Sequence, residues 1–297
     1  MIDIKNVTKK FEDKEVLKNI NINVRRGSIF GLIGPNGAGK TTLIKCIMGI
    51  YKTDGGIIKV NGSEVYDNEN IKRIIGYVAD ENNYFSGFSV KDMLDFYGLS
   101  YGKFSIKRFN ELNDVFQISL KKNVRRLSKG MKTRLAIMLN LSIMPEVIVL
   151  DEPTSGLDPI AKRQVLSILM DDAAERKTTM FISTHNLTDL EKVCDSIAII
   201  NNGEIKYTNT LEEMKKNIRK FQVAFRDDPP NDLKSWKEVL NVEKYGRVYN
   251  IITSSCAEEV IDRLKKYEIM FIEEVDLSLE DMFIYTMRSE KNEIKDI

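Results

Sequence analysis

A glycine-rich segment, Gly34 to Thr41, has the chemistry needed to hold a chain of phosphates. Its sequence, GPNGAGKT, matches the pattern G-x-x-x-x-G-K-[ST] in full. Glycines let backbone N–H groups curl around phosphate oxygens without obstruction by side chains. Lys40 would neutralise the outer phosphates, and the hydroxyl of Thr41 would bind Mg²⁺. The segment therefore predicts binding of a nucleoside triphosphate together with Mg²⁺.

A second chemical feature is a pair of acidic residues that directly follows an apolar run. Residues 146–150 read EVIVL and lead into Asp151 and Glu152. As a buried strand, this run would present both carboxylates at its C-terminal end, where open α/β sheets bind ligands. Asp151 would hold Mg²⁺, and Glu152 would orient and deprotonate an attacking water. The alternative is an ordinary strand end with a solvated acidic turn, and the phosphate-binding segment upstream favours the chemical role.

Alternating strand-like and helix-like segments must position these residues. Apolar runs predict strands at Ser28–Ile33, Glu146–Leu150 and Thr179–Ser183, and helical spacing marks Gly39–Ile50 and Ile160–Ala174. Strands that alternate with helices predict a parallel sheet with both faces covered. The glycine-rich segment would then join a strand to a helix whose positive N-terminal end points at the anion. In that setting, a glycine turn that binds nothing is a poor alternative.

The pattern of the chain changes near residue 220. The segments that follow read in order as strand, helix, two strands, helix and strand: Lys220–Phe225, Asn231–Val239, strands around Val242 and Val248 that flank Gly246, Ala257–Tyr267, and Ile269–Val275. This β-α-β-β-α-β order predicts a small ferredoxin-like unit. A last amphipathic helix is expected from about Ser278, followed by a charged tail.

Composition narrows the classes of protein to which the chain can belong. Its 297 residues suggest about two domains, and the 42% of hydrophobic residues suit a globular core. The net charge of +1 gives no general attraction to nucleic acid or anionic lipid. Cys46, Cys194 and Cys256 form no CxxC pair, which argues for reduced thiols. No run approaches about 18 apolar residues and the N-terminus lacks a signal core, so a membrane role would require a partner.

These motifs, with others further along the chain, resemble those of the ATPases of ATP-binding cassette (ABC) transporters. Residues 127–131, LSKGM, resemble the signature motif of the family, which usually reads LSGGQ. Residues 155–158, SGLD, resemble its D-loop. His185 follows a strand at the place where the family has its switch histidine. The resemblance covers nearly the whole chain, and the order and spacing of the motifs make a chance match negligible.

The resemblance implies a fold and a division into domains. Residues 1–217 would form an α/β P-loop NTPase core of the ABC ATPase type, with a helical subdomain at about residues 82–142 that carries the signature motif. Residues 218–297 would form a small α+β, ferredoxin-like accessory domain that ends in an amphipathic helix. We interpret this domain as a module that stabilises a dimer or senses a partner, and the alternative is a cap over apolar surface.

The resemblance also assigns roles to individual residues. ATP would be bound by Phe11, Gly34, Pro35, Asn36, Gly37, Ala38, Gly39, Lys40, Thr41 and Thr42 of one subunit, and by Ser128 and Gly130 of the opposing subunit. Mg²⁺ would be bound by Thr41, Asp151 and Asp80. Catalysis would depend on Glu152, His185 and Lys40, while Ser155, Gly156, Leu157 and Asp158 would communicate between two composite sites. In this arrangement, hydroxyl and backbone donors of the signature motif bind a γ-phosphate in trans.

Two of these assignments have a structural alternative. His185 is the only histidine of the chain, and its imidazole can donate to phosphate and fix the geometry of Glu152 and water. An isolated histidine is otherwise more often structural. Phe11 has the ring face needed to stack on adenine, but it is equally well explained as a packed core residue.

The sequence departs from the family pattern at two places. Where the family usually has glutamine after a strand, residues 75–78 are followed by Ala79, Asp80 and Glu81, and Asp80 is the best match. A carboxylate can approach Mg²⁺ or water but cannot donate a hydrogen bond, and an exposed turn is the equal alternative. The signature motif has Lys129 in place of glycine and Met131 in place of glutamine. Lys129 would add positive charge near phosphate, or it would simply face solvent.

The function implied is that of an ATP-hydrolysing subunit that powers a membrane transporter. It would pair with a second nucleotide-binding subunit, as a homodimer or heterodimer, and with separate transmembrane permease subunits, at the cytoplasmic face of the membrane. It would be a peripheral protein there and soluble when isolated. The permease would dock around residues 80–96, which include Tyr84, Phe85 and Phe88, unless these aromatic residues belong to the core.

The ending of the chain and the absence of insertions refine this expectation. Residues 278–283, SLEDMF, resemble the ending of single-cassette ATPases that export peptides, antibiotics or lipids. The alternative is a cassette ATPase that regulates or signals through a membrane complex without transport. Cassette ATPases of DNA repair or translation carry coiled-coil or zinc-bearing insertions, which this sequence lacks, so no nucleic acid partner is expected.

Overall fold

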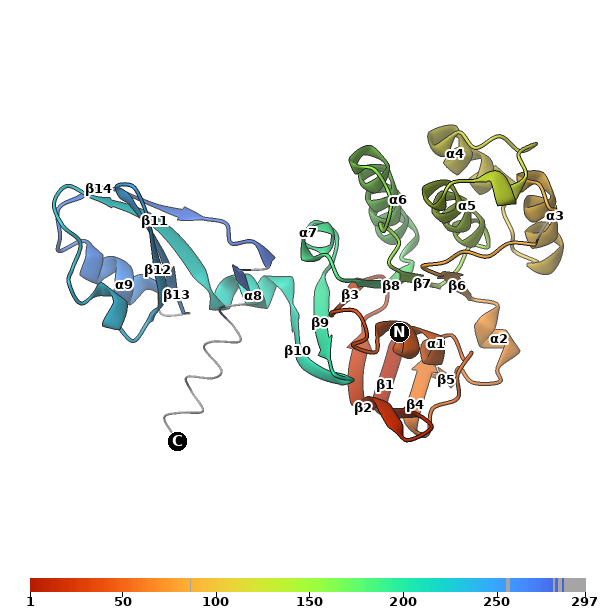
Figure 1. Ribbon diagram of the computed structural model, residues 1–297, viewed down its shortest axis with the longest axis horizontal. Coiled ribbons are helices and arrows are strands. Elements are labelled where there is room, and N and C mark those ends of the chain that lie inside the picture. The colour runs from red at the N-terminus through yellow and green to blue at the C-terminus, as the bar shows by residue number, and fades with distance from the viewer. Residues whose placement is uncertain (86, 255–256, 280, 283–284, 286–297) are drawn as a thin grey trace. The chain divides into compact units, whose positions relative to one another are not determined.

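The computed structural model describes residues 1–285 except residue 86, residues 255–256, residue 280 and residues 283–284. The chain divides into two compact units, Met1–Thr208 and Asn209–Ile297. The division falls before helix α8 (Leu211–Asn217), whereas the expected domain boundary followed residue 217. Figure 1 shows the elements of both units.

The first unit is built around a six-stranded sheet with the order β10-β9-β3-β8-β7-β6. Its strands are β3 (Ile29–Ile33), β6 (Ile75–Val78), β7 (Val147–Asp151), β8 (Thr179–Thr184), β9 (Ser196–Asn201) and β10 (Glu204–Thr210). Parallel pairing joins β3 to β8 and β9, and joins β7 to β6 and β8. Strands β3, β7 and β8 are buried along their whole length, as expected where both faces of a parallel sheet are covered. The predicted parallel sheet is therefore confirmed.

A smaller antiparallel sheet in the same unit had not been predicted. Its strands, in spatial order, are β2 (Lys14–Val24), β1 (Ile2–Phe11), β4 (Gly55–Val60) and β5 (Ser63–Glu64). Apolar side chains from both sheets and from helix α1 (Lys40–Ile47) form one core, which includes Ile4, Leu17, Phe30, Leu43 and Phe181. Because α1 is anchored in this core, the loop that precedes it is held in place. A short helix, α2 (Glu69–Lys72), leads into β6.

A group of helices lies between β6 and β7 in the sequence. They are α3 (Val90–Ser100), α4 (Ile106–Phe116), the 3-10 turn η1 (Val124–Arg126) and α5 (Lys129–Ser142). Each α-helix begins after a serine whose side-chain oxygen accepts a backbone N–H of the first turn: Ser89, Ser105 and Ser128. Residues 135–142 of α5 are all buried, so this helix is the centre of the group. Figure 1 shows α3, α4 and α5 beside one another.

Two further helices follow strands of the large sheet. Helix α6 (Pro159–Arg176) comes after β7 and confirms the helix predicted at residues 160–174. The carboxylate of Asp158 caps it by accepting the N–H groups of Ile160 and Ala161. Helix α7 (Leu187–Leu190) comes after β8 and is capped in the same way by Asn186.

The second unit contains a four-stranded sheet with the order β12-β13-β11-β14. Its elements are β11 (Arg219–Phe225), the 3-10 turn η2 (Leu233–Ser235), β12 (Val239–Tyr245), β13 (Val248–Thr253), α9 (Ala257–Leu264) and β14 (Ile269–Val275). The strand pairs are antiparallel. Buried side chains from α9, η2 and the sheet, including Phe221, Trp236 and Val260, form the core of this unit. Order and pairing agree with the ferredoxin-like arrangement expected from the sequence.

The first helix predicted for this unit is wrong. Instead of a helix over residues 231–239, the chain forms only η2, and Val239 already belongs to β12. Leu233 and Trp236 are both buried, and Trp236 has an extended backbone that ends the turn. Burial of these two side chains is thus achieved by one short turn. Most of the helix predicted from about Ser278 lies outside the described residues.

Candidate active site

The glycine-rich loop lies between β3 and α1, as the sequence predicted. A Cβ atom on Gly34 would lie 2.3 Å from the carbonyl oxygen of Ile200, so no larger residue fits there without movement of the backbone. Gly39 has a φ of 109°, which L side chains rarely adopt. The loop borders an open cavity of about 270 Å³, which is lined by Val16, Pro35, Asn36, Gly37, Gly39, Lys40, Thr41, Thr42, Asp80 and Glu152. The cavity therefore combines exposed loop backbone with one lysine and two carboxylates.

The ammonium group of Lys40 is held inside the loop. Its Nζ donates to the carbonyl oxygen of Gly34 at 2.7 Å and to that of Pro35 at 3.3 Å. It also lies 3.5 Å from Oε1 of Glu152, and only 6% of the side chain is exposed. A charge with so little access to water interacts strongly with any anion that enters the cavity. Lys40 is thus placed to neutralise phosphate.

Asp151 lies at the end of β7 and is almost completely buried. Its Oδ1 accepts a hydrogen bond from the Ser183 hydroxyl at 2.5 Å, and Thr41 donates a second hydrogen bond. Burial raises the pKa of the Asp151 carboxyl, the two hydrogen bonds lower it, and the nearby charges of Glu152 and Asp80 raise it further. A cation beside this carboxylate would offset the burial. The acid therefore has the surroundings of a metal ligand.

The oxygen donors around the cavity fit Mg²⁺. The Thr41 hydroxyl and the carboxylates of Asp151 and Asp80 are hard ligands of the kind that Mg²⁺ prefers. Among the residues that the structure describes, no group of three histidine, cysteine or acidic side chains is arranged to hold a metal alone. Mg²⁺ typically takes one or two protein carboxylates and completes its shell with substrate phosphates and water. The donor set thus suits a metal that arrives with a nucleotide.

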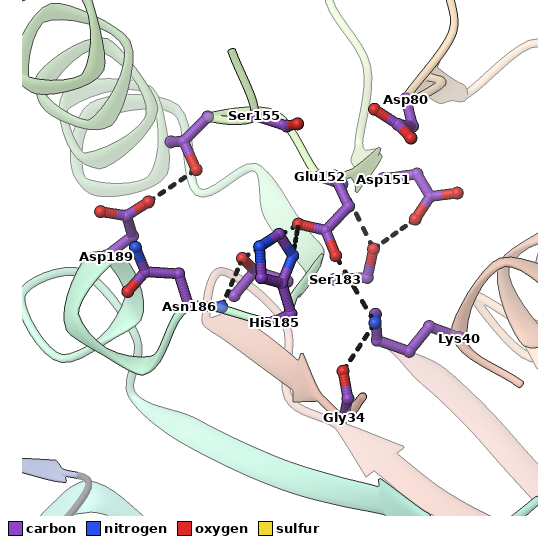
Figure 2. A network of polar contacts seen from close by, with 12 residues as sticks. Gly34, Lys40, Asp80, Asp151, Glu152, Ser155, Ser183, His185, Asn186 and Asp189 are labelled. Atoms are coloured by element: carbon purple, nitrogen blue, oxygen red, sulfur yellow. Dashed lines mark hydrogen bonds and ion pairs between the residues drawn. The ribbon is translucent and has the colours of Figure 1, made fainter. Parts of the chain in front are cut away.

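Glu152 is positioned from both sides by neighbouring groups, as Figure 2 shows. Its Oε2 lies 3.0 Å from Nδ1 of His185 and accepts from the Thr184 hydroxyl at 3.2 Å. Its Oε1 faces Lys40. The backbone of Glu152 has a φ of 50°, a left-handed conformation that costs an ordinary residue about 1–2 kcal/mol. A hydrogen bond from its N–H to the Ser183 carbonyl helps to hold this turn.

The signature segment packs against the D-loop segment of the same chain. The Ser128 side chain accepts the N–H of Met131 and caps α5. A Cβ atom on Gly130 would come within 3.0 Å of Leu157 and 3.5 Å of the Gly156 carbonyl oxygen. Neither Ser128 nor Gly130 lines the cavity beside Lys40. The two motifs lie together, but the signature motif does not serve the phosphate cavity of its own chain.

Asp80 and Lys129, the two departures from the family pattern, contact each other. The Lys129 Nζ lies 2.9 Å from Oδ1 of Asp80 and 3.4 Å from Oγ of Ser155. Asp80 also lines the phosphate cavity, so it is more than a residue of an exposed turn. Lys129 has a carboxylate partner rather than facing solvent alone. This contact was not predicted, because no periodic pattern in the sequence indicates it.

Phe11 is not a buried core residue, because 40% of it is exposed. Its ring meets the edge of Tyr51 with centroids 5.3 Å apart, and the Lys9 ammonium lies 5.4 Å from its centroid. It does not line the phosphate cavity. An exposed ring leaves a face for stacking, so the contact with adenine stays a prediction.

Several polar partners of the site had not been predicted. Ser183 and Thr184 hold the carboxylates of Asp151 and Glu152, as described above. Asp189 accepts from the Thr154 hydroxyl at 2.7 Å and from Lys162 at 3.1 Å, and thereby joins α7 to the segment after β7 (Figure 2). Of these partners, Ser183 is the one that strand pairing indicates, because the parallel pairing of β7 with β8 places Ser183 beside Asp151.

The chain is similar to known proteins that are named as ATP-binding proteins of transporters. The family model described as ABC transporter matches residues 17–155. The chain is 31% identical to the ABC transporter ATP-binding protein YtrB of Bacillus subtilis, over 96% of this chain and 97% of that protein. It is 34% identical to the bacitracin transport ATP-binding protein BcrA of Bacillus licheniformis, over 74% of this chain and 73% of that protein.

The chain is also similar to an import ATP-binding protein and to solved structures of ATP-binding cassettes. The chain is 37% identical to the methionine import ATP-binding protein MetN of Clostridioides difficile, over 74% of this chain and 73% of that protein. Among solved structures, the ATP-binding subunit of an ABC transporter has a TM-score of 0.66 and 29% identity, over 73% of this chain and 92% of that chain. A dimeric ATP-binding cassette, MJ0796, in a post-hydrolysis state with ADP and Pi, has a TM-score of 0.65 and 25% identity, over 71% of this chain and 99% of that chain.

Proposed function

Because this chain belongs to the family of ABC transporter ATP-binding proteins, we propose that two such subunits close around ATP and thereby drive export through separate membrane subunits. As a member of the family, the protein is the ATP-binding subunit of a transporter. It is an ATPase that uses ATP with Mg²⁺. The observation that carries the proposal is that Lys40 and Glu152 line one cavity, while Glu152 is held between Lys40 and His185.

Each residue of the cavity has a distinct part in the proposed reaction. The loop backbone and Lys40 hold the phosphates, while Thr41 and Asp151 hold the metal. Mg²⁺, when bound, neutralises the charge that develops on the phosphate oxygens. Glu152 accepts the proton of the attacking water, since its carboxylate is held at the edge of the cavity by neighbours on both sides. His185 fixes the orientation of that carboxylate through Nδ1 and leaves its other nitrogen for the γ-phosphate.

The second half of each site comes from the opposing subunit. Ser128 and Gly130 lie away from the cavity of their own chain, which supports a role toward the nucleotide of a partner. The Asp158 carboxylate caps α6 and lies 3.4 Å from Arg134 of α5. A displacement of α5, the helix that follows Ser128, would therefore also move the D-loop. The similar cassette MJ0796, which forms a dimer with ADP and Pi bound, supports closure of two cassettes.

An exposed aromatic group supports docking of a membrane subunit. Phe85 is 54% exposed, and its ring lies 5.2 Å from that of Phe88 and 5.4 Å from that of Phe96. Tyr84 is different, because its hydroxyl donates to the Lys132 carbonyl at 2.9 Å and its ring is mostly covered. We therefore assign Phe85, Phe88 and Phe96 to the docking surface and Tyr84 to its support. In the part of the chain described by the structure, no helix is long and apolar enough to cross a membrane.

The proposed direction of transport is export. Named relatives include a bacitracin transport protein and a methionine import protein. Export is supported by the resemblance of residues 278–283 to the ending of export ATPases. The subunit would act at the cytoplasmic face of the membrane, where its ATP is available.

Capture of the partner tests the proposal directly. Tagged protein with Glu152→Gln would be incubated with ATP and Mg²⁺ in detergent-solubilised native membranes, and bound proteins would be identified by mass spectrometry. A polytopic membrane protein in stoichiometric amount is the expected result. Replacing Phe85 with Ser should reduce its recovery, while replacing the exposed Leu99 with Ser serves as the matched control. Recovery of soluble proteins alone, with a known membrane complex captured in parallel, would refute the transport function.

A further inference from the structure

Lys129 joins three segments that the proposed function uses separately. It is the first residue of α5, directly after Ser128 of the signature motif. Its stem crosses the D-loop, because the Lys129 Cδ lies 3.5 Å from the position that a Cβ atom would take on Gly156. Its Nζ then reaches Ser155 at 3.4 Å and Asp80 at 2.9 Å. One side chain thus connects the signature motif, the D-loop and the acid after β6.

The acid that holds Lys129 belongs to two cavities at once. Asp80 lines the phosphate cavity together with Lys40, Thr41 and Glu152. It also lines a neighbouring cavity of about 240 Å³ that contains Lys129. The carboxylate therefore stands in the wall between the cis nucleotide site and the signature motif. A change in its partner on one side changes the charge presented to the other side.

The ion pair between Lys129 and Asp80 is weak enough for Lys129 to exchange Asp80 for another anion. The side chains of Lys129 and Asp80 are 50% and 44% exposed, and an ion pair between groups so exposed to water contributes little to stability. A triphosphate carries several negative charges and offers stronger hydrogen-bond acceptors than one carboxylate. Lysine has a flexible stem with three donors, so it can change partner without movement of α5. A phosphate brought beside Ser128 would therefore displace Asp80.

We propose that Lys129 is a phosphate-binding residue in trans, which Asp80 and Ser155 hold until the opposing subunit brings its ATP. The inference rests on the proposed function, because that function brings the opposing phosphate to the signature motif. Transfer of the ammonium group frees the Asp80 carboxylate, which faces the cavity of its own chain near Thr41. Closure at one composite site thereby changes the charge beside the nucleotide in the other site. The competing interpretation is that Lys129 only holds Asp80 and Ser155 of its own chain and binds no phosphate.

Dimerisation measurements separate the two interpretations. All variants would carry Glu152→Gln, and ATP-driven dimerisation with Mg²⁺ would be followed by sedimentation equilibrium. Lys129→Met keeps the stem over Gly156 but removes the charge, and Lys129→Arg keeps the charge. Lys132→Met is the matched control, since Lys132 is on the same helix and lines the same second cavity. Binding of a fluorescent ATP analogue would show that each monomer is folded and loaded.

The expected results are specific to transfer across the interface. Lys129→Met should weaken the dimer about tenfold or more, since a hydrogen bond to a charged group is lost. Lys129→Arg should restore most of the affinity, and Lys132→Met should have little effect. With Asp80→Asn added, the loss caused by Lys129→Met should persist, because the ammonium group acts on the partner rather than on Asp80.

Three outcomes would overturn the inference. If Lys129→Met dimerises as well as Lys132→Met, Lys129 binds no phosphate in trans. If its effect disappears once Asp80 is replaced by Asn, Lys129 acts only as a clamp within its own chain. If the parent Glu152→Gln protein forms no dimer with ATP and Mg²⁺, the proposed function fails, and the inference fails with it.

Discussion

Nδ1 of His185 lies 3.0 Å from Oε2 of Glu152, while the other oxygen of the same carboxylate faces Lys40 at 3.5 Å. The two contacts hold the carboxylate between a phosphate-binding residue and a histidine that follows the neighbouring strand. Since Glu152 also has a left-handed backbone, its position is determined by the turn as well as by its partners. A carboxylate held in this way needs little reorganisation to act on a water at the cavity.

Replacing Glu152 with Gln should abolish turnover and retain ATP binding. The amide keeps the shape of the side chain but cannot accept a proton, and loss of general-base catalysis typically lowers kcat by about 10²–10⁴-fold. Phosphate release measures the rate, and a fluorescent ATP analogue measures the affinity. Replacing the exposed Glu81, which follows Asp80 outside the phosphate cavity, with Gln is the control. Turnover at the normal rate in the Glu152 variant would exclude Glu152 as the base.

Replacing Lys40 with Met should weaken ATP binding. The ammonium group is buried beside the loop carbonyls, and a hydrogen bond from such a charge to phosphate is worth about 1.5–3 kcal/mol. The dissociation constant for ATP with Mg²⁺ should therefore rise roughly 10- to 100-fold. Lys45→Met, on the same helix but beside Tyr51, is the control and should bind ATP nearly normally. Equal affinity of both variants would show that Lys40 does not contact the phosphates.

The large sheet was predictable because its strands carry a strong local signal. Strands β3, β7 and β8 are short runs of apolar residues buried on both faces, so composition alone identified them. The antiparallel sheet gave a weaker signal. The pairing of β1 with β2 contains register shifts between Ile4 and Val7 and near Lys9, and Asn6 and Asn19 have positive φ angles. These irregularities break the alternation by which a half-buried strand is recognised.

The site was predictable where residue order encodes it and not where distant residues meet. The glycine loop and the acids after β7 depend on local sequence, and the structure brings Lys40, Asp151 and Glu152 together. The contact between Asp80 and Lys129 joins residues 49 positions apart, on segments without a shared period. Neither residue type indicates the other, so the pairing follows only from the packing of α5 against β6, which Asp80 follows in the chain.

Replacing Asp172 with Ala should destabilise the first unit. The carboxylate is 1% exposed and accepts from Arg108 of α4 at 2.9 Å and from the Thr178 hydroxyl at 3.0 Å. Removal leaves Arg108 without its buried partner, which typically costs about 3–5 kcal/mol. Denaturant unfolding followed by circular dichroism, to which the helices of the first unit contribute most, measures the change. The adjacent, exposed Asp171 is the matched control, and Asp171→Ala should unfold like the parent protein. Equal midpoints for the two variants would contradict this prediction.

The thiol of Cys46 should react slowly with iodoacetamide, at a rate that keeps rising with pH. Cys46 lies in α1 and is 1% exposed, and burial raises its pKa to about 11. Only the thiolate reacts, and below the pKa its fraction grows about tenfold for each unit of pH. Alkylation of the folded protein should therefore accelerate about tenfold per unit between pH 8 and pH 10. Labelling at each pH, read by peptide mass spectrometry, measures the rate at Cys46.

The sign of this shift also predicts how the thiol affects stability. Because the pKa of Cys46 is higher in the folded chain than in the unfolded chain, its contribution to stability is complete below the unfolded value, near 9. That contribution is lost as pH rises through about 11. If Cys46 reacted only in unfolded molecules, its rate would instead follow an ordinary thiol and level off above pH 9. A plateau there, matching a reference peptide, would show that labelling occurs through opening of α1 and not at the buried thiol.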